Sequence, residues 1–300
     1  MYYNKLLKAI IACIIVLSGL VMAKPLNVVA VTEDFASIAR SIGGEHIQVS
    51  SFVQGNVDLH SVKARPSMAM KLKKADLLIT LGMRQDLWVN GLIQVARNPK
   101  VFQGASGYLD CSVGIKKLNV PTGMIDGRVG DVHMQGNPHY WLSPLNGLII
   151  ARHIKDKLIS LDPEHQEFYE ANFSIFQTEL EEKLVVWKEK LSSFQNFNFI
   201  SYHQIWSYFY EAFNLNGIGQ VEPLPGIPPT ARHLAYLKEK ALGSKKDIFI
   251  ISASYYPKGN GERFSEMVNG RYIILPTNVG DKHIKTYFDL FDEIITRLSK

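Results

Sequence analysis

The stretch Gly136-Asn-Pro-His-Tyr-Trp-Leu-Ser-Pro144, near the middle of the chain, holds one imidazole in a restrained backbone. Pro138 fixes its own φ and disfavours the helical region for Asn137, so the chain reaches His139 in an extended, stiff conformation. The Ser-Pro pair that closes the stretch predicts an N-cap and a first-turn proline, hence a helix over 144–159. A histidine held in this way has the positional precision that a metal ligand needs. Alone it is a weak signal, because most such histidines are polar loop residues.

The first 23 residues have the three parts of a secretory signal peptide. Lys5 and Lys8 form a positive region, an uncharged apolar run follows over 9–21, and Val21-Met-Ala23 fits the small-residue cleavage pattern. The apolar run is too short for a comfortable membrane span, although an uncleaved anchor is the alternative. We expect a cleaved signal peptide over 1–23 and a periplasmic, secreted protein.

The composition is that of an ordinary globular protein, with 46% of the 300 residues hydrophobic and 20% charged. The formal net charge is +5, and the basic pairs Lys73-Lys74, Lys116-Lys117 and Lys245-Lys246 are dispersed along the chain. This dispersion predicts no nucleic-acid binding. Cys111 is the only cysteine outside the signal peptide, so we expect neither an intramolecular disulfide nor a cysteine metal cluster. We expect a monomer.

Residues 24–161 are expected to form an N-terminal α/β lobe, because apolar runs alternate with amphipathic segments along them. The expected strands cover 26–31, 47–53 and 77–81, and the expected helices cover 34–42, 66–74 and 87–96. This alternation is typical of a parallel sheet with helices on both faces. Residues 104–136 are rich in glycine and lack periodicity, which predicts a long, functional loop.

A long helix is expected to follow this lobe. From Pro163 to Leu191, apolar residues recur at steps of three and four, and neither glycine nor proline interrupts them. At 1.5 Å per residue this helix would be about 40 Å long, enough to span two lobes. The alternative is a long helix within one domain. We assign 162–194 to this linking helix, with Asp162 as its N-cap.

Residues 195–300 are expected to form a C-terminal α/β lobe on the same plan. The expected strands cover 197–201, 215–221, 247–252 and 271–275, and the expected helices cover 203–213, 230–242, 262–268 and 284–298. The predicted fold class is therefore α/β, with two lobes of mostly parallel sheet joined by one backbone helix.

Three histidines stand where an expected strand has just ended or an expected helix is about to begin. His60 follows the strand over 47–53, His139 lies between the long loop and a helix, and His203 follows the strand over 197–201. In open α/β sheets, ligands collect outside the carboxyl ends of the strands. Two lobes that face each other would bring the three imidazoles to one cleft. Such a nitrogen site suits Zn²⁺ well and Mn²⁺ or Ca²⁺ less well.

Over nearly all of the chain after residue 23, these motifs resemble the metal-binding receptors of ABC importers, the ZnuA/TroA-like (cluster A-I) solute-binding proteins. The family's ligand loops are similar to Gly55-Asn-Val-Asp58-Leu-His60, to the 136–144 stretch and to Ser201-Tyr-His203, and its following strand is similar to Ala75-Asp-Leu-Leu-Ile-Thr-Leu-Gly82. Each motif alone is modest, but several in this order are specific. The resemblance implies capture of a transition metal, most often zinc, in the cleft between the lobes, and its delivery to a membrane permease.

The fourth ligand is where this chain departs from many relatives. Where they place an aspartate before the final helix, this chain has Asn278, a poor substitute for a carboxylate. Manganese-type members draw a glutamate from the segment that matches Glu222, in Val221-Glu222-Pro223. The resemblance therefore implies the metal ligands His60, His139, His203 and Glu222, with Asp281 or a water as the alternative to Glu222.

The loop before the second ligand is short of the histidines and aspartates that zinc-type relatives often carry. It holds Asp126, Asp131 and His133. The stretch Gly130-Asp-Val-His133 forms an auxiliary acquisition site, helps to close the cleft, or belongs to a solvent-exposed loop. The remaining histidines are interpreted as surface or capping residues. Trp141 and Trp206 are expected to belong to the core and to shield the site from water.

The predicted function is that of an exported solute-binding receptor that captures a divalent transition metal, most often zinc, and delivers it to an ABC permease. Zn²⁺ is then the transported ligand and the protein is not an enzyme. The alternatives are a manganese- or iron-selective receptor of the same fold, an added role as a surface adhesin, and a zinc-dependent hydrolase. Against the hydrolase, the sequence lacks His-Glu-x-x-His and Gly-x-Ser-x-Gly.

Overall fold

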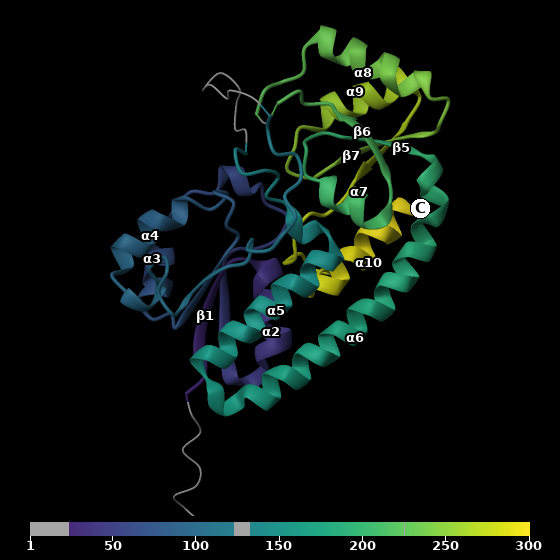
Figure 1. The fold of residues 1–300 in the computed structure, drawn as a ribbon. Coiled ribbons are helices and arrows are strands. Elements are labelled where there is room, and N and C mark those ends of the chain that lie inside the picture. Colours follow the sequence, from purple (N-terminus) through teal and green to yellow (C-terminus); the bar gives the residue numbers. More distant parts are fainter. Residues whose placement is uncertain (1–23, 123–132, 225) are drawn as a thin grey trace, which may run out of the picture.

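The computed structural model describes residues 24–122, 133–224 and 226–300, and it shows two parallel four-stranded sheets (Figure 1). In the N-terminal sheet the order β2-β1-β3-β4 corresponds to Ile47–Val53, Leu26–Thr32, Leu77–Thr80 and Tyr108–Asp110. In the C-terminal sheet the order β6-β5-β7-β8 corresponds to Asn216–Gln220, Asn198–Ser201, Ile248–Ser252 and Arg271–Ile274. The predicted α/β fold class is confirmed. In both sheets the strand order reverses beside the first strand, and ligands bind outside the carboxyl ends at such a point.

Helices cover both faces of the N-terminal sheet. The helices α2 (Glu33–Gly43) and α5 (Pro144–Leu161) lie on one side of it, and α3 (Pro66–Lys73) and α4 (Trp88–Ala96) lie on the other (Figure 1). The strand β3 is therefore buried along its whole length, and its four residues are all apolar except the last. A continuous apolar run of this kind is what a strand covered on both faces requires.

The C-terminal sheet is covered in the same way. The helix α7 (Ser207–Phe213) lies on one side, and α8 (Ala231–Gly243) and α9 (Lys258–Val268) lie on the other (Figure 1). The predicted cap of α8 is confirmed, because the Thr230 hydroxyl accepts a hydrogen bond from the backbone N–H of His233. The last helix, α10 (Tyr287–Leu298), returns to the region between the lobes.

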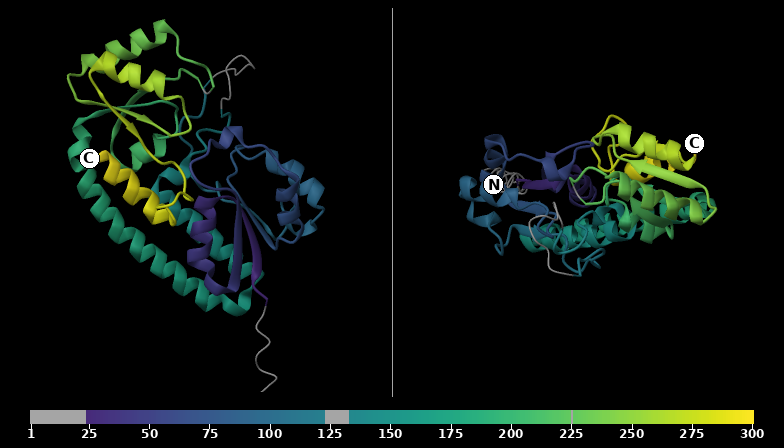
Figure 2. Two further views of the ribbon diagram at one scale, coloured as in Figure 1. Left: turned by 180° about the vertical axis from the view of Figure 1, so that it is seen from behind. Right: turned by 90° about the horizontal axis from the view of Figure 1, so that it is seen from above.

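The helix α6 (Gln166–Leu191) runs along the side of both lobes, as the two opposite views show (Figures 1 and 2). It packs against α2 and α5 of one lobe and against α10. The ring centroids of Phe176 and Phe288 lie 4.9 Å apart, and the Trp187 indole donates a hydrogen bond to Asp292. One continuous apolar cluster therefore extends through both lobes.

The structure differs from the sequence-based expectations at several places, among them the starts of α9 and α10, which begin at Lys258 and Tyr287 rather than at residues 262 and 284. The expected loop over 104–136 contains the short strand β4, which glycines in the surrounding sequence disguised. The helix expected from residue 203 begins at Ser207, because residues 202–206 form a turn. Ser143 takes the N-cap position of α5 without a capping hydrogen bond from its side chain. Asp162 does not cap the linking helix either, and accepts hydrogen bonds from the Tyr169 hydroxyl and the His165 ring.

A seam of specific hydrogen bonds joins the two lobes beside the cleft. The Asp34 carboxylate, at the start of α2, accepts from the Asn278 amide at 3.0 Å and from the backbone N–H of Val279 at 2.9 Å. The carbonyl of Val279 accepts from the backbone N–H of Gly55 at 2.9 Å. Gly55 and Gly280 approach so closely that a Cβ on Gly280 would lie 2.4 Å from the Gly55 nitrogen. The loop that leads to His60 is thus tied to the C-terminal lobe.

The predicted signal peptide over 1–23 lies outside the described residues. Among the residues that are described, every helix is too short or too polar to cross a lipid bilayer.

Candidate metal centre

The three histidines singled out by the sequence come together at the cleft between the lobes. His60 lies in a short 3-10 turn after β2, His139 lies just before α5, and His203 lies two residues after the end of β5. Each offers one ring nitrogen to a group in which the three nitrogens lie within 4.8 Å of one another. The predicted convergence of these imidazoles is therefore present in the structure.

The spacing of the rings suits one tetrahedral ion. The ring centroids lie 5.5 Å apart for His60 and His139, 5.3 Å for His60 and His203, and 6.0 Å for His139 and His203. A tetrahedral zinc with Zn–N bonds of about 2.05 Å holds its ligand nitrogens about 3.3 Å apart. The three nitrogens lie within 4.8 Å of one another, so each pair would need to close by at most about 1.5 Å to share one such ion.

Each imidazole is held by an oxygen at its Nδ1 atom. The Nδ1 atom of His60 lies 2.8 Å from a carboxylate oxygen of Asp58, and that of His139 lies 2.9 Å from the side-chain amide oxygen of Asn137. The Nδ1 atom of His203 lies 2.6 Å from a carboxylate oxygen of Glu222. An Nδ1–H that donates to an oxygen fixes the tautomer, so that Nε2 is the nitrogen left to bind a metal. This arrangement fixes the orientation of each ring before a metal arrives.

The electrostatics favour a neutral His139 ring and an ionised Asp58 carboxylate. Burial lowers the pKa of His139 well below its ordinary value, and the neighbouring His60, His133 and His203 lower it further. Burial acts to raise the pKa of Asp58, but hydrogen bonds from the ring and backbone of His60 overcome this effect, and the net pKa is lowered. A neutral imidazole and an ionised carboxylate are the protonation states that metal binding requires.

Aromatic rings form part of the wall around the histidines. The Trp141 ring lies 5.3 Å from the His139 ring, and its indole donates a hydrogen bond to the carbonyl of Thr277 in the opposite lobe. The Tyr256 ring lies 5.6 Å from the His203 ring. Trp206, in contrast, is buried in the core against Phe209. Of the two tryptophans expected to shield the site, Trp141 is the one in contact with a histidine ring of the site.

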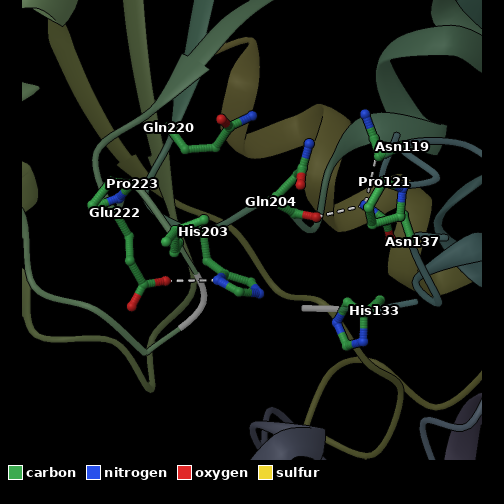
Figure 3. A pocket seen from close by; sticks show the side chains of 10 residues that line it. Asn119, Pro121, His133, Asn137, His203, Gln204, Gln220, Glu222 and Pro223 are labelled. Carbon is green, nitrogen blue, oxygen red and sulfur yellow. Dashed lines mark hydrogen bonds and ion pairs between the residues drawn. The ribbon is translucent and has the colours of Figure 1, made fainter. Parts of the chain in front are cut away.

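The carboxylates named as candidates for the fourth ligand, Glu222 and Asp281, lie outside the group of three histidines. Glu222 is not part of the group of three. One of its oxygens contacts His203 Nδ1 (Figure 3), and the other accepts a hydrogen bond from the backbone N–H of Gly226 at 2.9 Å. Asp281 is exposed and also lies outside the group. Asn278 is engaged by Asp34 in the interlobe seam. The role of Glu222 as a metal ligand stays a prediction, and its observed contact is with the ring of His203.

The other histidines behave mostly as expected. His46 and His165 stack on each other with ring centroids 3.7 Å apart, His233 contacts the carbonyl of Gln220, and His283 is exposed. His133 is different, because it lines a pocket with His203 and Glu222 (Figure 3). Asp126 and Asp131, the acidic residues of the same expected loop, lie outside the described residues.

Sequence reasoning missed Asp58 and Asn137 as supports of the metal site. The signal was present, because an aspartate or asparagine stands two residues before His60 and before His139. At that spacing the side-chain oxygen also accepts the backbone N–H of the histidine, at 2.9 Å in both cases. An Asx residue that folds back onto the chain in this way can hold the ring and the backbone together.

A family model described as ZnuA, the periplasmic component A of a zinc-uptake complex, matches residues 28–300. The chain belongs to this family. Solved structures agree with the ZnuA-family fold. A crystal structure of ZnuA has a TM-score of 0.74 at 22% identity, and covers 92% of this chain and 98% of that chain. A manganese-bound periplasmic metal-binding protein from Candidatus Liberibacter asiaticus has a TM-score of 0.76 at 19% identity, and covers 91% and 98% of the two chains.

Curated relatives of this ZnuA-family chain are named for several metals. The manganese ABC transporter substrate-binding lipoprotein PsaA of Streptococcus anginosus is 27% identical over 189 residues, which are 62% of this chain and 58% of the relative. The iron-binding protein YfeA of Yersinia pestis is 27% identical over 171 residues, 57% and 50% of the two chains. The match thus spans only about half the length of these relatives.

Proposed function

We propose that this protein is a periplasmic receptor that captures a divalent transition metal, with zinc as the preferred metal, and delivers it to an ABC permease. The observation that supports this most is the set of three imidazoles from two lobes, each held at Nδ1 so that Nε2 is left for one ion. Binding and release need no bond-breaking chemistry, so no catalytic group is required.

The donor atoms favour zinc over manganese. Imidazole nitrogen suits Zn²⁺, whereas carboxylate and carbonyl oxygens suit Mn²⁺. In the described group all three ligand atoms are nitrogens. A manganese- or iron-selective receptor is the second candidate, because the relatives named above are described as manganese and iron proteins.

Glu222 is proposed to support His203 from outside the coordination sphere. Both of its oxygens already accept hydrogen bonds, one from the His203 ring and one from the Gly226 backbone. A carboxylate in this position raises the basicity of the imidazole and fixes its direction. The same engagement disfavours the zinc hydrolase, since Glu222 is not free to act as the general base beside the metal.

The test is metal analysis of the purified protein. Wild type should hold one zinc per chain after dialysis and should take up zinc in preference to manganese when the two compete. His139→Ala should lose this binding, whereas His283→Ala, which removes an exposed histidine, should not. A wild-type protein without stoichiometric metal would overturn the proposal, and metal-dependent hydrolysis of an ester or phosphate that His203→Ala abolishes would favour the hydrolase.

A further inference from the structure

His133 lies beside two histidines of the metal centre, His60 and His139, although its ring nitrogens lie outside the group of three whose atoms are within 4.8 Å of one another. Its Nε2 lies 3.0 Å from Nε2 of His60, with the two ring centroids 5.0 Å apart. Its ring centroid lies 5.9 Å from that of His139. The ring also lines the pocket into which His203 projects from the side of Glu222 (Figure 3). The separation from His139 falls in the range of 5.3–6.0 Å found among His60, His139 and His203, and the separation from His60 is slightly shorter than that range.

The contact between His60 and His133 has the geometry of two ligands of one ion. His60 uses Nδ1 for Asp58, so Nε2 is its metal-binding nitrogen, and that nitrogen is the one that faces His133. Two nitrogens on a tetrahedral zinc lie about 3.3 Å apart, and the observed separation is 3.0 Å. A cation placed between the rings would need them to part by only a few tenths of an ångström.

We propose that His133 is the fourth ligand, so that the ion is held by the four imidazoles of His60, His133, His139 and His203. This inference rests on the proposed function and names the coordination of that same site. The sequence offers a parallel: Asp131 stands two residues before His133, as Asp58 does before His60 and Asn137 before His139. The same spacing occurs at Asp281 and His283, whose ring is exposed, so the spacing alone does not make a ligand.

A fourth imidazole determines which metal the receptor prefers. Four nitrogen donors and no carboxylate form a set that suits zinc and disfavours manganese, which prefers oxygen. Four protein ligands also leave no open position for a reactive water, whereas catalytic zinc sites keep one. The proposal therefore assigns His133 both a share of the affinity and the selectivity for zinc. Glu222 remains outside the coordination sphere.

X-ray absorption of the zinc-loaded, full-length protein gives a direct count of coordinated imidazoles. Wild type should show four nitrogen donors with imidazole scattering, and His133→Ala should show three with one oxygen from water. The zinc affinity of His133→Ala should fall by more than the roughly 10- to 100-fold that loss of a supporting contact costs. Its preference for zinc over manganese should fall with it, and His133→Glu should shift the preference further towards manganese.

Two further variants separate failure of this inference from failure of the proposed function. His283→Ala is the matched control, because it removes an exposed histidine with the same Asx spacing, and it should leave the absorption spectrum and both affinities unchanged. If His139→Ala abolishes binding while His133→Ala keeps wild-type ligation and affinity, the receptor stands and His133 is not a ligand. If wild type itself binds no zinc, the receptor assignment fails first.

Discussion

Glu222 and His203 form a buried pair in which a carboxylate oxygen lies 2.6 Å from the ring Nδ1. The second carboxylate oxygen accepts the backbone N–H of Gly226, so the carboxylate is anchored from the side away from the histidine. The pair gives His203 the same support that Asp58 gives His60 and Asn137 gives His139. The three supports come from different segments, and only Glu222 is distant in sequence from the ring that it holds.

Replacing this carboxylate should weaken metal binding without abolishing it. In Glu222→Gln, the neutral amide oxygen still accepts from Nδ1, but the charge that raises the basicity of the imidazole is lost. We expect the zinc affinity to fall by roughly 10- to 100-fold with one metal still bound per chain, as measured by competition with a chelating indicator. Glu211→Gln, which changes an exposed glutamate, should have no effect. A complete loss of binding, equal to that in His203→Ala, would show instead that Glu222 is a ligand.

Zinc binding should weaken as the pH falls through about 6, because protons compete for the imidazoles. His139 should take little part in this competition, since burial and its three histidine neighbours hold its pKa well below the ordinary value. The number of protons displaced per zinc should therefore be smaller than the number of coordinating histidines. Affinities measured by competition between about pH 7.5 and 5.5 give this number as a slope. A flat profile would contradict an imidazole site.

The buried Asp34 should give the fold a distinctive dependence on pH. Burial raises the pKa of Asp34 from 3.8 to about 6, although bonds from Asn278 and Val279 act to lower it. The Asp34 carboxyl therefore binds a proton more tightly in the folded state than in the unfolded chain. Its contribution to the free energy of unfolding rises as the pH falls from above 6 towards 4. By linkage, the ionised carboxylate costs about 3 kcal/mol at neutral pH.

The measurement is urea unfolding of wild type and Asp34→Asn at several pH values. The free energy of unfolding of wild type minus that of the variant should increase by about 2 kcal/mol between about pH 7.5 and 4, which is most of the total. Asp156→Asn, which changes an exposed aspartate, is the control and should run parallel to wild type. A constant difference for Asp34→Asn would mean that Asp34 does not carry this penalty.

The interlobe seam should not tolerate a side chain at Gly280. This residue has a φ of +116°, and an added Cβ would lie 2.4 Å from the backbone nitrogen of Gly55, which has no freedom to move aside as a side chain would. We expect Gly280→Ala to lose about 2 kcal/mol or more of stability and to weaken zinc binding through displacement of the loop that leads to His60.

Gly259→Ala is the matched control for this substitution. Gly259 lies in α9, where an added Cβ meets nothing within 4 Å, so alanine there should be neutral or stabilise the protein by about 0.4–1 kcal/mol. Thermal unfolding and zinc titration of both variants compare the two positions directly. Equal stability of the two variants would show that the backbone around Gly55 and Gly280 can move apart to accommodate the added Cβ.

The fold and the three central histidines could be predicted because they depend on local pattern. The apolar runs predicted the buried strands, the steps of three and four predicted α6, and the strand ends placed His60 and His203 at the carboxyl edges of the two sheets. The contacts of Glu222 could not be predicted in the same way. A position at the end of β6 says which cleft the side chain enters, but not whether its oxygens face a metal or a neighbouring ring.

Side-chain contacts between segments that are far apart in the sequence could not be predicted from local pattern. Asn278 reads as a poor replacement for a ligand, and its bond to Asp34, which lies 244 residues away, depends on how the two lobes meet. The strand β4 was missed because three residues flanked by glycines show no periodicity. The roles of Asp58 and Asn137, in contrast, could have been predicted, because each stands two residues before a histidine in the sequence.

The helix α6 has a consequence for how a transport partner can recognise the loaded state. Because α6 packs on α2 and α5 at one end and on α10 further along, it restricts bending of the two lobes relative to each other (Figure 1). Bending the two halves towards each other would strain a rod of 26 residues. The difference between empty and filled protein should therefore be confined to the rim above the histidines, and solution scattering should record nearly equal dimensions for both.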